Sequence, residues 1–223
     1  MVWRQLARAL ALALPARQRY EAGACPHPPL DFSEPTAASS FVAVDDRVMG
    51  GASRSFVRPT AGAIRFEGEL IVEGGGFASV RYTPAFALPA DVEALRMEAR
   101  SDGRAGYKLT LRSASADPSV SYQFLLPRLE AEDFTEVRMP LAEFLPSIRG
   151  RPCPEAPPLT ARDVCSLGLM LSRYDAGGGE KVSIPPGRFW LEIKNIGVAE
   201  SELAINGRRW VRPSRRGGEG QPE

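Results

Sequence analysis

The amino-acid sequence predicts an all-β protein, an antiparallel β-sandwich of the jelly-roll type. Apolar and polar residues alternate with a period of two in several segments, for example at Tyr107, Leu109 and Leu111, as half-buried strands require. Gly, Pro, Asp and Ser lie between these segments, and 21 glycines and 20 prolines in 223 residues allow many turns. Short strands at this spacing are typical of a sandwich or jelly roll.

The expected strands follow one another closely along the chain. Strong alternation marks 107–112, 120–126, 167–171 and 189–193, and weaker patterns mark 39–44, 53–57, 63–72, 77–82, 95–99 and 136–139. Two segments, 91–94 and 141–144, can each form a short helical turn. The sequence has no long helical period after its first 24 residues.

The chain divides into four expected regions. We expect a flexible organelle-targeting leader at 1–24, a Pro-rich linker at 25–38, the β-sandwich domain at 39–200 and a basic, Gly-rich tail at 201–223. The first 20 residues contain four arginines and no acidic residue, and a basic amphipathic helix is typical of mitochondrial targeting. A plastid transit peptide, a secretory signal and an ordinary surface helix are the alternatives.

The composition argues against several classes of partner. Because 28 Lys and Arg stand against 27 Asp and Glu, the net charge of +1 does not favour nucleic-acid binding. No apolar run reaches the ~18 residues that a membrane-spanning helix needs, so any membrane association is expected to be peripheral. The three cysteines have neither the number nor the spacing of a disulfide framework or a zinc site.

Catalysis has few candidate residues. The single histidine, His27, lies in the Pro-rich linker, which argues against histidine-based chemistry. Asp45, Asp46 and Asp102 are acids that a glycosidase mechanism could use, but acids beside glycines are usually turn formers. No Gly-rich fingerprint lies between a strand and a helix, so no nucleotide cofactor is expected. We therefore predict a protein without enzyme activity, cofactor or metal.

Two glycine-rich loops are the most distinctive local feature. Residues 45–53 have the sequence DDRVMGGAS, and Gly74 to Gly76 precede the strand FASVR. Glycines allow positive φ and close backbone approach, while paired carboxylates can accept hydrogen bonds from a turn or bind a hard cation. Both segments lie at strand ends. We therefore expect one contiguous loop end formed by Asp46, Gly50, Gly51, Gly76, Ser79 and Arg81.

Together, DDRVMGGAS and GGGFASVR resemble the complex I intermediate-associated protein family, the thirty-kilodalton assembly-factor domain. The resemblance continues through the SDGR segment at 101–104 and through 139–144, 149–151, 166–169 and 189–196, so it covers about residues 39–199. Two positions depart from the usual pattern. Glycine stands at 74–75 where the family commonly has an asparagine, and Ser101 replaces the usual glycine.

The resemblance implies a galactose-binding-like jelly roll and a non-enzymatic, chaperone-like protein-binding module. Its expected partners are assembly intermediates of complex I (NADH:ubiquinone oxidoreductase) and other assembly factors. The implied location is the mitochondrial matrix or the matrix face of the inner membrane, with the plastid as the alternative. The alternative functions are a carbohydrate- or calcium-binding module and an assembly factor for a photosynthetic complex.

The motif residues and the arginines near them are the candidates for partner binding or for structuring the loops. Arginine is enriched where proteins meet, although Arg81 and Arg149 can instead form ion pairs with Asp45, Asp46 or Asp102 that fix the loops. The candidate residues are Asp45, Asp46, Arg47, Met49, Gly50, Gly51, Ser53, Gly75, Gly76, Phe77, Ser79, Arg81, Asp102, Arg104 and Arg149.

Overall fold

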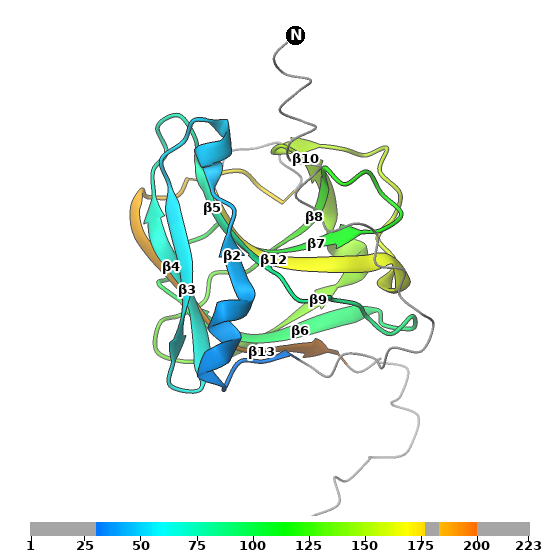
Figure 1. The fold of residues 1–223 in the computed structure, drawn as a ribbon, viewed down its shortest axis with the longest axis horizontal. Coiled ribbons are helices and arrows are strands. Elements are labelled where there is room, and N and C mark those ends of the chain that lie inside the picture. The colour runs from blue at the N-terminus through cyan, green and yellow to red at the C-terminus, as the bar shows by residue number, and fades with distance from the viewer. Residues whose placement is uncertain (1–29, 177–182, 200–223) are drawn as a thin grey trace, which may run out of the picture.

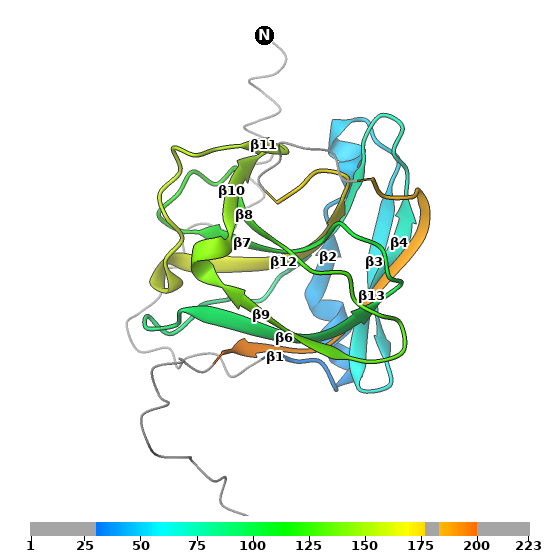
Figure 2. The same cartoon turned by 180° about the vertical axis from the view of Figure 1, so that it is seen from behind.

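The computed structural model describes residues 30–176 and 183–199. It confirms the antiparallel all-β sandwich, with two sheets packed face to face (Figures 1 and 2). One sheet has six strands in the order β3-β4-β13-β6-β9, with β1 paired to β13. The other has seven strands in the order β11-β10-β8-β7-β12-β5-β2.

The six-stranded sheet consists of β1 (Leu30–Asp31), β3 (Arg54–Thr60), β4 (Ala63–Leu70), β6 (Ala94–Ser101), β9 (Thr135–Pro140) and β13 (Gly187–Val198). The seven-stranded sheet consists of β2 (Phe41–Ala43), β5 (Phe77–Tyr82), β7 (Tyr107–Ser113), β8 (Val120–Leu125), β10 (Leu145–Ile148), β11 (Arg151–Pro152) and β12 (Val164–Ser172). Four short 3-10 helices connect them: η1 (Pro35–Ser40), η2 (Asp46–Met49), η3 (Leu141–Glu143) and η4 (Ala161–Asp163).

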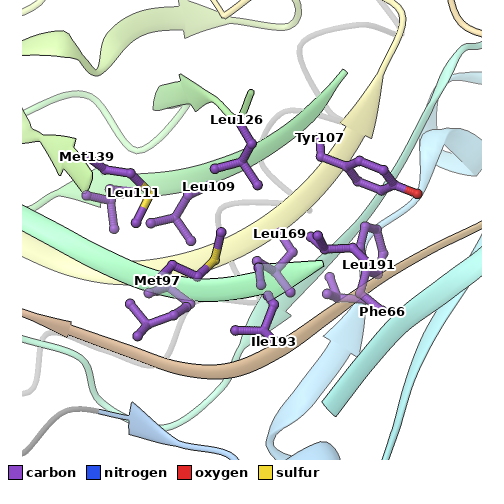
Figure 3. Packing of buried hydrophobic residues seen from close by; sticks show 14 of the residues in the cluster. Phe66, Met97, Tyr107, Leu109, Leu111, Leu126, Met139, Leu169, Leu191 and Ile193 are labelled. Atoms are coloured by element: carbon purple, nitrogen blue, oxygen red, sulfur yellow. The ribbon is translucent and has the colours of Figure 1, made fainter. Parts of the chain in front are cut away.

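One apolar core fills the space between the sheets. The alternation along β7 turns Leu109 and Leu111 inward, into the same core cluster as Leu191 and Ile193 of β13 (Figure 3). All four side chains are fully buried. Burial of each such side chain contributes about 2 kcal/mol relative to exposure in water, so this core is the main stabilising feature of the fold.

The structure departs from the expected elements mainly near prolines and at the chain's first strand. The segment 39–44 begins as η1 rather than as a strand, because Pro35 starts a helical turn and Ala38 packs into the core. Strand β10 was not expected, because it contains Pro146 and proline is rare within strands. Strand β1 lies within the expected linker, and the core includes Phe32 beside it.

Two short turns are expected outside the strands, at 91–94 and 141–144. The turn expected at 141–144 is present as η3. The turn expected at 91–94 lies slightly earlier, where the Val92 amide donates to the Pro89 carbonyl at 3.2 Å, and β6 begins at Ala94. Among the residues that the structure describes, no helix has the length and apolar character needed to cross a membrane.

Candidate functional site

The two glycine-rich loops lie side by side at one end of the sandwich. Pairing of β2 with β5 causes this, because the last residue of β2 lies opposite Val80. The pairing continues into the loop, where the Val44 amide donates to the Ser79 carbonyl at 2.8 Å. The loop at 45–53 therefore contacts the loop at 74–76, which is the arrangement expected from the sequence. A role of this loop end in partner binding stays a prediction.

Asp46 joins the two loops through hydrogen bonds. Its Oδ1 accepts from the Ser53 amide at 3.0 Å. Its Oδ2 accepts from the Ser53 hydroxyl at 2.9 Å, the Gly76 amide at 2.8 Å and the Phe77 amide at 3.3 Å. The residue is fully buried. Because all these donors are neutral amide or hydroxyl groups, the carboxylate is satisfied without a cation.

Asp45 ties the same loop to two strands. Its Oδ2 accepts from the Ser55 amide at 2.9 Å, and its Oδ1 accepts from the Ser55 hydroxyl at 2.5 Å and the Ser79 amide at 3.0 Å. Ser55 lies on β3 of the six-stranded sheet, whereas Ser79 lies on β5 of the seven-stranded sheet. Asp45 therefore links the two sheets at the loop end, and the Ser79 hydroxyl adds a bond to the Val44 carbonyl.

Two of the glycines are required because Asp46 fills the space beside them. A Cβ on Gly51 would lie 2.3 Å from the Asp46 Cγ, and a Cβ on Gly75 would lie 2.1 Å from its Oδ2. Gly76 has φ of 135°, and a Cβ there would lie 2.3 Å from the Cδ of Arg173. The motif glycines thus let the backbone approach the buried carboxylate closely enough to donate.

Around the buried carboxylates, the loop end exposes the charged residues Arg47 and Glu73. Gly50 closes η2 with φ of 89°, and Arg47 is exposed. The side chain of Met49 lies outside the described part of the structure. Within residues 30–176 and 183–199, no group of three or more His, Cys, Asp or Glu is placed to hold a metal ion. The two carboxylates act as structural acceptors.

The expected ion pairs between the loop carboxylates and the arginines do not form. Arg81 and Arg149 have no ion pair with any described residue, because the serine hydroxyls and main-chain amides already occupy Asp45 and Asp46. Arg149 instead occupies the β10–β11 turn, where its φ is 52° and its side chain is exposed. Arg81 lies on β5 and faces away from the core.

A second polar cluster holds the SDGR segment against β13. The carboxylate of Asp102 lies 2.6 Å from the Nε of Arg104 and accepts from the Tyr107 hydroxyl at 3.0 Å and the Trp190 amide at 3.3 Å. Arg104 also donates to the Pro185 carbonyl at 3.1 Å. Burial and the neighbouring Asp102 raise the pKa of Tyr107. The ion pair that the sequence suggested for Asp102 is therefore made by Arg104.

The outer face of the seven-stranded sheet holds residues that the sequence analysis did not single out. Lys108 is 1% exposed, and its ammonium donates to Gln123 Oε1 at 3.1 Å and to the Asp175 carbonyl at 2.6 Å. Burial lowers the pKa of Lys108 to about 8. The same alternation that turns Leu109 inward turns Lys108 and Arg112 outward, so the strand pattern contained the signal for this face.

On the outer face of the six-stranded sheet, charges are paired across strands. Glu192 on β13 lies 2.7 Å from both Arg65 of β4 and Arg100 of β6. The Arg65 guanidinium covers Trp190 at 4.7 Å from the ring centroid. Trp190 is half-buried beneath this arginine.

Comparison with known proteins identifies the family. Residues 30–193 match the family model described as complex I intermediate-associated protein 30. The chain belongs to the complex I intermediate-associated protein 30 (CIA30) family. The matched region contains both glycine-rich loops and nearly all of the described sandwich, so these features lie within the CIA30 domain. None of the curated proteins compared with the chain matches it.

Solved structures share the fold of this CIA30 domain at low sequence identity. A family 11 carbohydrate-binding module from Clostridium thermocellum, in complex with a β-1,3-1,4-mixed-linked tetrasaccharide, is 13% identical with a TM-score of 0.51. The match covers 78% of this chain and 97% of that module. The family 11 module of the cellulase Lic26A-Cel5E of the same organism is 12% identical, with the same coverage and a TM-score of 0.47. The first of these similarities supports the jelly-roll fold.

Proposed function

We propose that this CIA30 domain is a mitochondrial assembly factor for complex I that acts by binding other proteins, without catalysis. The observation that supports this most is the family match over residues 30–193, which includes both sheets of the sandwich and the motif loops. Its partners in this proposal are assembly intermediates of complex I and other assembly factors, and its place is the matrix or the matrix face of the inner membrane.

The geometry of the motif supports a scaffold rather than a reaction centre. Asp45 and Asp46 accept seven hydrogen bonds between them, all from neutral donors of the protein. Asp102 is held by Arg104 and Tyr107. Acids occupied in this way fix loop conformation and are poorly placed to exchange protons with a substrate. We infer that the loop end keeps the two sheets in register while other surfaces contact partners.

The proposed location depends on a leader at 1–24, which lies outside the described residues. Residues 1–30 fused to a fluorescent protein would direct the fusion to mitochondria if the proposal is correct. Entry into plastids would favour an assembly role in photosynthesis, and secretion would favour the carbohydrate-binding alternative. A fusion in which Arg4, Arg8, Arg17 and Arg19 are replaced by glutamine provides the matched control and should remain in the cytosol.

The function itself is tested by affinity capture. The tagged full-length protein would be purified from gently solubilised mitochondria, and the captured complexes would be separated on a native gel and identified by mass spectrometry. We expect co-migration with subunits of the complex I membrane arm, and no enrichment of subunits from another respiratory complex of similar abundance. Migration of the protein without complex I subunits at every stage of assembly would contradict the proposal.

A further inference from the structure

We propose that the outer face of the seven-stranded sheet is the surface that receives an acidic segment of a protein partner, with a carboxylate held between Arg81 and Arg112. The inference deepens the proposed function and rests on it, because it names the chemistry of the partner.

The seven-stranded sheet contains no carboxylate. None of the residues in β2, β5, β7, β8, β10, β11 and β12 is Asp or Glu, whereas these strands contain Arg81, Lys108, Arg112 and Arg151. Two acids in the flanking turns accept hydrogen bonds nearby, Asp117 from Ser119 and Asp163 from Thr160. A third, Asp175, follows β12 and acts to raise the pKa of Lys108 against the larger effect of burial. The face is therefore positively charged where its strands run.

Arg81 has no partner within the described structure. No hydrogen bond or ion pair joins its guanidinium to a residue of 30–176 or 183–199, although the side chain is only half-exposed. Burial lowers the pKa of Arg81, and no acid among residues 30–176 and 183–199 opposes this effect. A guanidinium presents five N–H donors and is costly to desolvate without acceptors, so this side chain is suited to an oxyanion supplied from outside.

Arg112 adds a second positive charge close to the first. Burial and the repulsion of Arg81 together lower the pKa of Arg112 to about 10. One of its nitrogens donates to the Pro118 carbonyl, which leaves other donors of the guanidinium for a ligand. Lys108 differs from this pair because Gln123 and the main chain of Asp175 already accept its hydrogen bonds. The unneutralised pair is Arg81 and Arg112.

The sheet surface between these arginines has no bulky side chain. Gly168 of β12 lies opposite Arg81 on one side and Thr110 on the other. A Cβ at Gly168 would lie 2.8 Å from the Thr110 Oγ1 and 2.7 Å from the Val80 carbonyl oxygen, so the position is confined to glycine. The hydroxyls of Thr110 and Ser166 make no hydrogen bond with a described residue. By strand register, Ser166 lies opposite Arg112, and Thr110 lies on the other side of Gly168 from Arg81.

The width of the face favours a peptide over a small anion. Exposed apolar side chains flank the arginines on both sides: Val42 on β2 is 47% exposed, and Leu145 on β10 is 48% exposed. Cations in the centre and apolar residues at the edges are complementary to a peptide segment that contains both acidic and apolar residues. An ionised carboxylate and a guanidinium form the bidentate hydrogen bonds that give such a contact its specificity.

Direct binding of an acidic peptide tests the inference. The purified full chain would be titrated with a fluorescent peptide of about ten glutamates, with a glutamine peptide of equal length as the control ligand. Arg81→Gln and Arg112→Gln should each weaken binding about tenfold, because a hydrogen-bonded charge pair contributes ~1.5 kcal/mol or more. Arg138→Gln on β9 is the matched control: it removes the same charge from an exposed site on the other sheet and should change the affinity less than twofold.

The side-chain Nε–Hε signals of the arginines give a second readout. Addition of the glutamate peptide should shift the signals of Arg81 and Arg112 and the amide signal of Gly168, while those of Arg65 and Arg100 stay unchanged. Equal affinity of wild type and Arg81→Gln, or an equal loss in Arg138→Gln, would overturn the inference. Saturation of the site by inorganic phosphate with no binding of the glutamate peptide would also overturn it, since it would indicate a small-anion site.

Repeating the capture experiment with the double variant separates this inference from the proposed function. If wild type captures complex I subunits and Arg81→Gln/Arg112→Gln loses them, both are supported. If both proteins capture these subunits equally, the acidic-segment inference is wrong while the assembly role stands. If neither captures them, the assembly role is wrong, and the peptide titration alone decides whether the face binds acidic chains.

Discussion

The two outer faces of the sandwich differ in whether their charged side chains are paired with opposite charges. On the six-stranded sheet, Glu192 is shared by Arg65 and Arg100, and Glu98 lies 2.6 Å from the Lys194 ammonium. On the seven-stranded sheet no strand contains an acid, and Arg81 has no partner among the described residues. One face is therefore neutralised by its own strands.

The difference separates charges that stabilise the fold from charges that are available for binding. A cross-strand pair of opposite charges contributes a fraction of a kcal/mol, and more when it is buried and bidentate. An unpaired guanidinium contributes nothing comparable and is repelled by its neighbour. Retention of such a group on a folded surface is therefore expected where an external partner supplies the missing charge. Substitutions on the two faces test this difference.

Asp46 is a carboxylate whose hydrogen bonds come from neutral donors instead of a cation. Its substitution should cause the largest loss of stability. Asp46→Ala leaves the amides of Ser53, Gly76 and Phe77 without an acceptor in a buried site. We expect a loss of about 4 kcal/mol in the free energy of unfolding. Urea denaturation measures it, with the exposed Asp91→Ala as control. A loss below about 1 kcal/mol would show that water replaces the carboxylate easily.

Glu192 tests the neutralised face. Glu192→Gln leaves Arg65 and Arg100 facing each other across an amide that can accept from only one of them, and the glutamate side chain is 3% exposed. We expect a loss of about 3 kcal/mol in unfolding free energy. Glu136→Gln is the matched control, because its partner Arg96 and the glutamate are 43% and 61% exposed. That substitution should cost less than about 0.5 kcal/mol.

Lys108 tests the seven-stranded sheet, because its contribution to stability should depend on pH. Its folded-state pKa of about 8 lies below the value of ~10.4 in an unfolded chain, so between these values the unfolded chain binds more protons. Stability attributable to Lys108 should therefore rise by about 2 kcal/mol from pH 8 to pH 10. The quantity to measure is the difference in unfolding free energy between wild type and Lys108→Met at the two pH values, since tyrosines and cysteines titrate there as well. A pH-independent difference would mean that Lys108 titrates normally.

The smallest effect is expected at Arg81. Arg81→Gln removes no ion pair and relieves repulsion with Arg112, so the free energy of unfolding should change by no more than about 0.5 kcal/mol. Arg65→Gln on the opposite face should lose more than 1 kcal/mol, because it breaks a pair with a buried acid. Thermal or urea unfolding of the two variants, side by side, provides the comparison. Equal losses would remove the distinction between the two faces.

Much of the fold follows from the sequence, and the exceptions have physical causes. Strand β5 occupies the predicted residues 77–82, and the alternation in β7 and β13 places the core correctly. Strand β11 is two residues long and contains Pro152, so its period cannot be recognised. The short β1 is stabilised by its pairing with β13, more than 160 residues away, which no local pattern records.

The loop end shows which parts of a site can be predicted from the sequence and which cannot. Two acids and the neighbouring glycines indicated a specific turn, and their adjacency followed from strand ends. The donors to Asp46 could not be predicted, because Gly76 reaches it only through the register of β2 with β5. Arginines were the expected partners of these acids by charge alone. In the folded protein, amide and hydroxyl donors are closer and reach the carboxylates without desolvating a cation.

The pairing of β1 with β13 has a mechanical consequence. Leu30 lies opposite Ile196, so the two ends of the described sandwich emerge from adjacent antiparallel strands on the same side. Tension applied between these ends loads the hydrogen bonds of β1 one after another, like a zipper, instead of all at once. The domain should therefore begin to open at low force from β1, while the core between the sheets resists until that strand has been peeled away.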